Sequence, residues 1–102
     1  MQSAKAAVGG GVSLSECAQA FRAMGDETRL GILLLLARGP RAAGEIVAEF
    51  DLAQSTISRH LTVLKQAGLV RASRSQQHII YELVPGALGG RWKRFATEMN
   101  GR

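Results

Sequence analysis

The sequence predicts a mainly α-helical fold that carries one β-hairpin, an α+β fold with elements in the order ααααββα. Apolar residues recur at helical spacing from residue 14 to 67, short β-favouring runs follow between residues 69 and 84, and helical spacing returns from residue 88. A length of 102 residues suits one small domain. We expect this domain to span residues 13–102, after a flexible N-terminal segment over residues 1–12.

Two helices are predicted in the first third of the chain. Ser13 and Glu16 have the spacing of a capping box, and apolar residues then form a narrow stripe over residues 14–24. Asp26 can cap a second helix over residues 27–38, which is apolar nearly all round. We therefore expect the second helix to be the buried centre of the domain.

Two further helices are joined by a tight turn. They are predicted over residues 42–50 and 54–67, because residues 51–53 are too few for another element. The later helix presents Ile57 and Leu61, with Leu64, to the core, and its opposite face is entirely polar.

A hairpin and a last helix complete the chain. The β-favouring runs cover residues 69–72 and 79–83, and the polar tip between them lacks the glycine often found in such turns. Apolar residues at spacings of 4, 3 and 4 predict an amphipathic helix over residues 88–99.

The positive charge is concentrated in the second half of the chain. Residues 1–53 carry five Lys and Arg against six Asp and Glu, whereas residues 54–102 carry eight against two, which together give the net charge of +5. Residues 54–81 hold four basic side chains and no carboxylate. Such a stretch is typical of a surface that meets phosphates, although a solvated basic face would look the same.

Two short helices joined by a turn and followed by a basic hairpin indicate a winged helix-turn-helix, whose second helix enters the major groove of DNA. Arg59 can donate two hydrogen bonds to guanine, and Gln54 can pair with adenine. These two residues share one exposed face with Ser55, Ser58 and Thr62. We expect the remaining contacts, mostly to the DNA backbone, from Thr56, His60, Lys65, Arg71, Arg74 and Gln76.

Three segments resemble the ArsR/SmtB family of prokaryotic winged-helix repressors. They are Gly-Asp-Glu-Thr-Arg-Leu at 25–30, Gln-Ser-Thr-Ile-Ser-Arg-His-Leu at 54–61 and Leu-Lys-Gln-Ala-Gly-Leu-Val at 64–70, within a similarity that covers residues 14 to about 84. The resemblance implies a dimer formed by the first and last helices. Apolar stripes on these helices agree with that expectation and comprise Leu14, Cys17, Ala18, Phe21, Leu88, Trp92, Phe95 and Met99. Ala53 departs from the family, which usually places a capping Ser there.

The resemblance also implies release of DNA by a metal or an oxidant, but this sequence lacks the ligands. The thiolate motif would fall on residues 45–50, which contain no Cys, and Glu98 is the one candidate ligand on the last helix. We therefore expect no metal and no cofactor. Cys17, the single cysteine, fits core packing, with an intersubunit disulfide or a sulfenate switch as the alternative.

We accordingly predict a homodimeric, sequence-specific repressor that binds double-stranded DNA at a two-fold symmetric operator, with no effector identified. The alternative is a winged-helix module that regulates through a partner protein. We find no set of catalytic residues, so an enzyme is not expected. The sequence has no apolar run of membrane-spanning length, and a single Cys suits a reducing cytoplasm.

Overall fold

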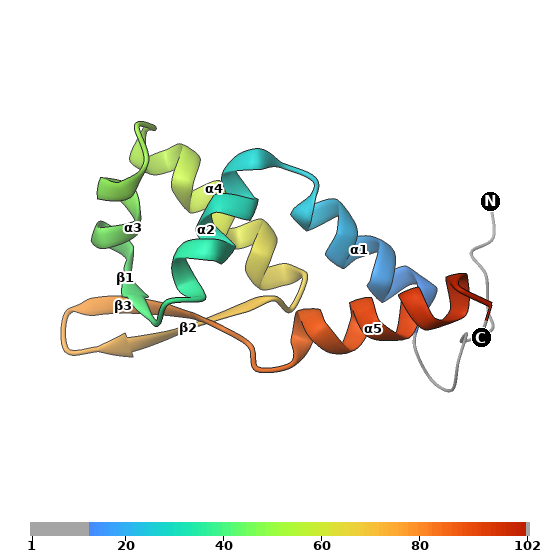
Figure 1. The fold of residues 1–102 in the computed structure, drawn as a ribbon. Helices are drawn as coiled ribbons and strands as arrows, with labels where there is room; N and C mark the ends of the chain where they lie inside the picture. The colour runs from blue at the N-terminus through green and yellow to red at the C-terminus, as the bar shows by residue number, and fades with distance from the viewer. Residues whose placement is uncertain (1–12, 102) are drawn as a thin grey trace.

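The computed structural model describes residues 13–101, apart from the side chains of Leu88, Arg91 and Arg94. The expected lead-in, residues 1–12, lies outside the described residues. The elements are α1 (Leu14–Met24), α2 (Glu27–Leu36), β1 (Arg41–Ala42), α3 (Ala43–Glu49), α4 (Gln54–Gln66), β2 (Val70–Ser75), β3 (His78–Leu83) and α5 (Ala87–Met99) (Figure 1). This arrangement confirms the predicted α+β class and the predicted helices.

The sheet contains one strand more than the sequence predicts. The strand β1 pairs antiparallel with β3, Arg41 opposite Tyr81 and Ala42 opposite Ile80, so the sheet has three strands in the order β1-β3-β2. Two residues are too short to show an alternating pattern, which is why β1 was not predicted. Its pairing connects the start of α3 to the hairpin (Figure 1).

Packing of the first four helices against β2 and β3 makes the core. Its most deeply buried side chains include Ile32, Ile46, Ile57, Leu64, Leu69 and Val70. They come from α2, α3, α4 and the entry to β2, so these elements bury their apolar faces together.

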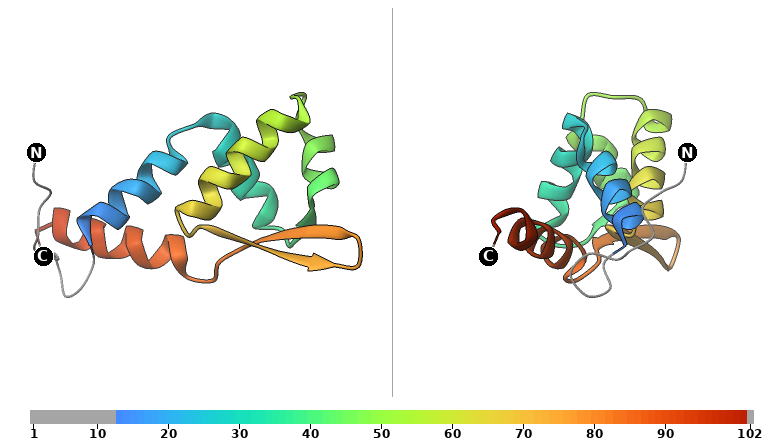
Figure 2. Two further views of the ribbon diagram at one scale, coloured as in Figure 1. Left: turned by 180° about the vertical axis from the view of Figure 1, so that it is seen from behind. Right: turned by 90° about the vertical axis from the view of Figure 1, so that its right-hand side faces the viewer.

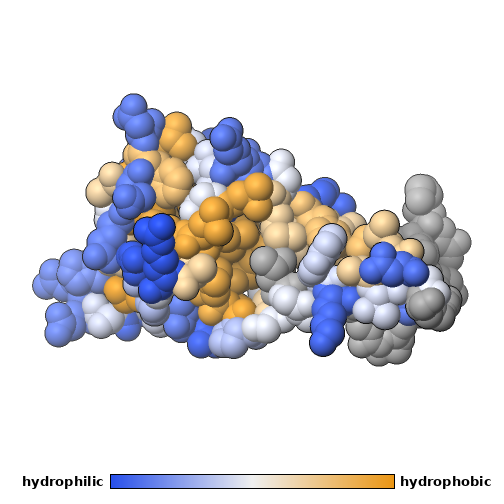
Figure 3. Space-filling view, in the orientation of Figure 1, coloured by the Kyte–Doolittle hydropathy of each residue, from blue (hydrophilic) through white to orange (hydrophobic). Residues whose placement is uncertain are grey.

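The expectation that α2 is buried all round is wrong for one face. Ile32, Leu33 and Leu36 are buried, but Leu30 is 46% exposed and Leu34 is 71% exposed. Neighbours on α1, α4 and β3 contact the remainder of α2. Apolar surface is consequently open over α2 in Figure 3.

The helices α1 and α5 lie side by side at the end of the molecule opposite the hairpin tip (Figures 1 and 2). Phe21 on α1 joins them through two ring contacts. Its ring centroid is 6.1 Å from that of Trp92, edge to face, and 5.3 Å from that of Phe95. Gly86, at a φ of 74°, makes the turn from the sheet into α5.

Capping side chains fix the starts of the first two helices. The Ser13 hydroxyl accepts a hydrogen bond from the Glu16 backbone N–H at 3.2 Å, and the Asp26 carboxylate accepts one from the Arg29 backbone N–H at 3.0 Å. Ala53, the residue before α4, supplies no side-chain cap. The predicted DNA-reading helix therefore starts with weaker support than α1 or α2.

Candidate nucleic-acid interface

The helix α4 has two opposite faces of different chemistry. Ile57, Leu61 and Leu64 are buried in the core. The other face is exposed and presents six of the predicted DNA-contacting residues, namely Gln54, Ser55, Ser58, Arg59, Thr62 and Lys65. This exposed face carries no carboxylate, so nothing on it would repel a phosphate or the acceptor edge of a base.

Two predicted contact residues of α4 are less accessible. Thr56 and His60 are half-buried. The Nδ1 atom of His60 lies 3.2 Å from Nη1 of Arg29 and 3.9 Å from a carboxylate oxygen of Asp26, both near the start of α2. One ring nitrogen of His60 is thus directed toward the protein body.

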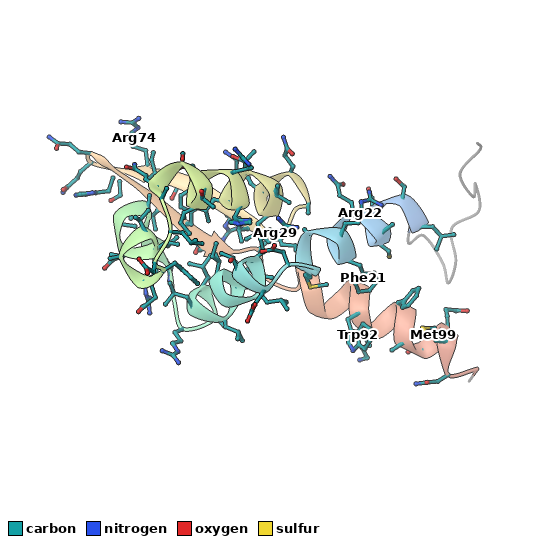
Figure 4. The ribbon with its side chains drawn as sticks, turned by 90° about the horizontal axis from the view of Figure 1, so that it is seen from above. Phe21, Arg22, Arg29, Arg74, Trp92 and Met99 are labelled. Carbon is teal, nitrogen blue, oxygen red and sulfur yellow. The ribbon has the colours of Figure 1, made fainter. Side chains whose placement is uncertain are left out.

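The hairpin supplies a second group of polar side chains. Ser75 pairs with His78, which leaves Gln76 and Gln77 as a two-residue turn. Arg74 and Gln76 are exposed at this tip, and Figure 4 shows Arg74 beyond one end of α4 on the same side of the molecule. The tip and the exposed face of α4 can therefore approach one DNA duplex together.

Arg71 differs from Arg74 because it has an acidic partner. Its Nε atom donates to a carboxylate oxygen of Glu82 at 2.8 Å, across a register pair of β2 and β3. Glu82 lies immediately beyond the carboxylate-free stretch of residues 54–81. Arg71 thus contributes less net positive charge to the surface than the sequence suggested.

Arg29 and Asp26 were not among the predicted site residues. Arg29 donates from Nε to the Ala23 carbonyl at 2.6 Å and from Nη2 to the Arg22 carbonyl at 3.3 Å, in addition to its contact with His60. The backbone N–H of Arg29 donates to the Asp26 carboxylate and lowers its pKa. The sequence predicted Asp26 only as the cap of α2, and Arg29 stood out only as part of the segment 25–30 that resembles the family.

The residues predicted for a dimer surface differ in how accessible they are. Trp92 is 56% exposed and Met99 is 69% exposed, and Ala18 is also exposed. Half-buried positions are Leu14, Phe21 and Phe95, whereas the side chain of Leu88 lies outside the described part of the chain. Cys17 is only 3% exposed, so its thiol packs inside the single chain and offers little surface to a partner.

Within the described part of the chain, the side chains form no cluster of three or more His, Cys, Asp or Glu able to hold a metal ion. Among the described helices, none is both long and apolar enough to cross a membrane.

Comparison with known proteins identifies similar regulators. A family model described as "Bacterial regulatory protein, arsR family" matches residues 26–72. The transcriptional repressor SdpR of Bacillus subtilis is 43% identical over 63 residues, which cover 62% of this chain and 70% of that protein. An uncharacterised HTH-type transcriptional regulator of Methanocaldococcus jannaschii is 43% identical over 70 residues, covering 68% and 79%. A homodimeric winged helix-turn-helix DNA-binding domain from Mycobacterium bovis superposes with a TM-score of 0.71 at 29% identity, over 85% of this chain and 82% of that chain.

Proposed function

The chain belongs to the ArsR family of bacterial regulatory proteins, and from this premise we propose that it is a homodimeric repressor acting on a two-fold symmetric DNA operator. It is a transcriptional regulator with a winged helix-turn-helix DNA-binding domain. One observation carries the proposal: α4 presents an exposed, carboxylate-free polar face on the side of the molecule where Arg74 lies (Figure 4).

The proposed readout divides the work between bases and phosphates. Arg59 donates to the O6 and N7 atoms of guanine, and Gln54 pairs with adenine, while Ser55 and Ser58 donate to either base. Lys65, with Thr56, Thr62, Arg71, Arg74 and Gln76, positions the protein on the duplex backbone, whereas His60, which the sequence also suggested as a contact, faces Arg29 in the protein body. Two α4 helices related by a two-fold axis would read half-sites about 34–36 Å apart.

We propose that α1 and α5 form the dimer surface. Trp92 and Met99 expose large apolar side chains on α5, and Leu30 and Leu34 expose apolar side chains on α2, where Figure 3 shows a hydrophobic patch. Met24 and Gly89, together with Leu30, line the groove that joins these two areas. Contiguous apolar surface of this kind is expected to be covered by a partner, and a two-fold dimer covers the same patch twice.

Repression follows from occupancy of the operator. A dimer bound across a promoter excludes RNA polymerase, and release would require an effector or a fall in protein concentration. A metal-free control mechanism agrees with the absence of Cys from residues 45–50 and with the burial of Cys17. We propose that the protein acts in the cytoplasm, where prokaryotic DNA lies, and as a regulator without enzymatic activity, in line with relatives named as transcriptional regulators.

The test compares Arg59→Ala with Arg38→Ala, which removes the same charge from an exposed position just beyond α2. A duplex selected by the wild-type chain from a randomised library is titrated at several salt concentrations. We expect Arg59→Ala to weaken binding about 10- to 100-fold while the dimer persists, and Arg38→Ala to change it little. Unchanged binding by Arg59→Ala would refute the assigned readout. Failure of the wild type to select any duplex would instead favour the partner-protein alternative.

A further inference from the structure

Three helices of the chain meet at one arginine. All three guanidinium nitrogens of Arg29 are engaged: Nε donates to the Ala23 carbonyl, Nη2 to the Arg22 carbonyl and Nη1 to Nδ1 of His60. The first two acceptors belong to the last turn of α1, and His60 lies in the middle of α4. Arg29 itself lies in the first turn of α2, beside the capping carboxylate of Asp26. We call these five residues the α1–α2–α4 junction.

We propose that Arg29 is a positioning residue for DNA recognition, which fixes the orientation of α4 relative to α1 through its hydrogen bond to His60. This inference rests on the proposed function, because it assigns a role to a residue that need not touch DNA. In Figure 4 Arg29 lies where α1, α2 and α4 converge, away from the hairpin tip.

The apolar core and the junction hold α4 by different kinds of contact. Ile57, Leu61 and Leu64 hold its inner face by apolar contacts, which have no preferred direction and act on one side of the helix only. A hydrogen bond from a charged, planar donor is both stronger and directional. Since Arg59 immediately precedes His60 in the chain, a rotation released by loss of this bond would displace the side chain expected to read guanine.

The junction also connects the proposed dimer surface with the proposed DNA surface. Phe21 on α1 contacts Trp92 and Phe95 on α5, and the next residue, Arg22, gives its carbonyl oxygen to Arg29. Arg29 would thus help to fix the position of α4 relative to the two-fold axis of the dimer. Because both half-sites must be matched at once, an error in this orientation would count twice in each dimer.

The chemistry of His60 defines which substitutions should be tolerated. Its Nδ1 atom accepts from Arg29, so the neutral ring must carry its proton on Nε2. The side-chain oxygen of His60→Asn can occupy a place close to Nδ1 and accept the same bond. His60→Leu retains volume but offers no acceptor, and Arg29→Lys retains the charge but has no planar fork.

The experiment measures the affinity of the 102-residue chain for two duplexes, one selected by the wild type from a randomised library and one scrambled duplex of the same composition. Fluorescence anisotropy gives both affinities, sedimentation gives the dimer fraction, and thermal unfolding gives the stability. The variants are Arg29→Ala, Arg29→Lys, His60→Leu, His60→Asn and the Arg29→Ala/His60→Leu double variant. Arg38→Ala is the control for loss of one positive charge.

We expect Arg29→Ala, Arg29→Lys and His60→Leu to lose at least about tenfold in affinity for the selected duplex and much less for the scrambled duplex. His60→Asn should stay within about threefold of the wild type, and the double variant should lose little more than either single variant. Equal losses on both duplexes, or folded Arg29→Ala that binds the selected duplex like Arg38→Ala, would overturn the inference. So would failure of His60→Asn to restore binding. If the wild type selects no duplex, both the proposed function and this inference are refuted. If the wild type selects a duplex but the Arg29 and His60 variants bind it with unchanged affinity, only this inference is refuted.

Discussion

Truncation of Trp92 should separate the two subunits while leaving each one folded. A tryptophan side chain offers about 200 Å² for burial, and 56% of Trp92 is exposed in the single chain, so a partner can cover about 110 Å² of it. At about 25 cal/mol per Å² this is worth about 3 kcal/mol per subunit, and about 6 kcal/mol per symmetric dimer. Association recovers only part of such an area-based value, and each factor of ten in affinity corresponds to about 1.4 kcal/mol. We therefore expect Trp92→Ala to raise the dimer dissociation constant between about 100-fold and 10,000-fold.

Sedimentation velocity over a concentration series measures this constant directly. The matched control is Leu52→Ala, which truncates a side chain that is 42% exposed in the turn before α4, far in the chain from the proposed dimer helices. Circular dichroism checks that α5 remains folded, because Trp92 also contacts Phe21. A Trp92→Ala chain that stays dimeric at the concentrations where the wild type does would refute the assignment of α5 to the interface.

Three further predictions concern stability and its dependence on pH. Ala53→Ser should add the missing cap of α4 and stabilise the chain by about 1 kcal/mol in urea unfolding, and an unchanged midpoint would contradict this. Gln76, at a φ of 58°, has a left-handed backbone, so Gln76→Gly should raise the unfolding free energy by up to about 1 kcal/mol; a decrease would show that the turn is not strained. Because the pKa of Asp26 is lowered on folding, its ionised form stabilises the native state at neutral pH, and this contribution disappears as the pH falls through the lowered pKa. The stability of the wild type should hence decline relative to Asp26→Asn, which keeps a capping oxygen, as the pH falls from about 5 towards 2, and parallel curves would exclude this role.

Local patterns were sufficient for the helices but not for features that depend on distant neighbours. Helical periodicity placed α1 and α4 closely, and the Ser13 capping box marked the start of α1, since these signals are contained within one segment. The strand β1 exists because Arg41 and Ala42 pair with β3, about forty residues later in the chain. A two-residue segment contains no pattern from which this pairing could be predicted. Likewise, the exposed face of α2 could not be foreseen from a run of leucines, because burial depends on which neighbours are available.

In the candidate site, too, local features could be predicted from the sequence, whereas contacts between distant residues could not. The helical spacing of polar and apolar residues along α4 identified its exposed face, which includes Arg59. The pairing of Arg71 with Glu82 required the hairpin register, and the contact of Arg29 with His60 joins residues 31 positions apart. Both contacts decide how a charged side chain is used, and neither partner can be identified from the local sequence around Arg71 or Arg29.

The strand order β1-β3-β2 has a consequence for the behaviour of the protein at high concentration. It leaves β2 at the edge of the described sheet, where unpaired backbone groups could recruit a strand from another molecule. Arg71 and Arg74 lie on this edge strand, and their charges discourage such strand addition. Arg74 would then guard against aggregation whenever DNA is absent, and replacing it with an apolar residue should shorten the time the free protein stays in solution.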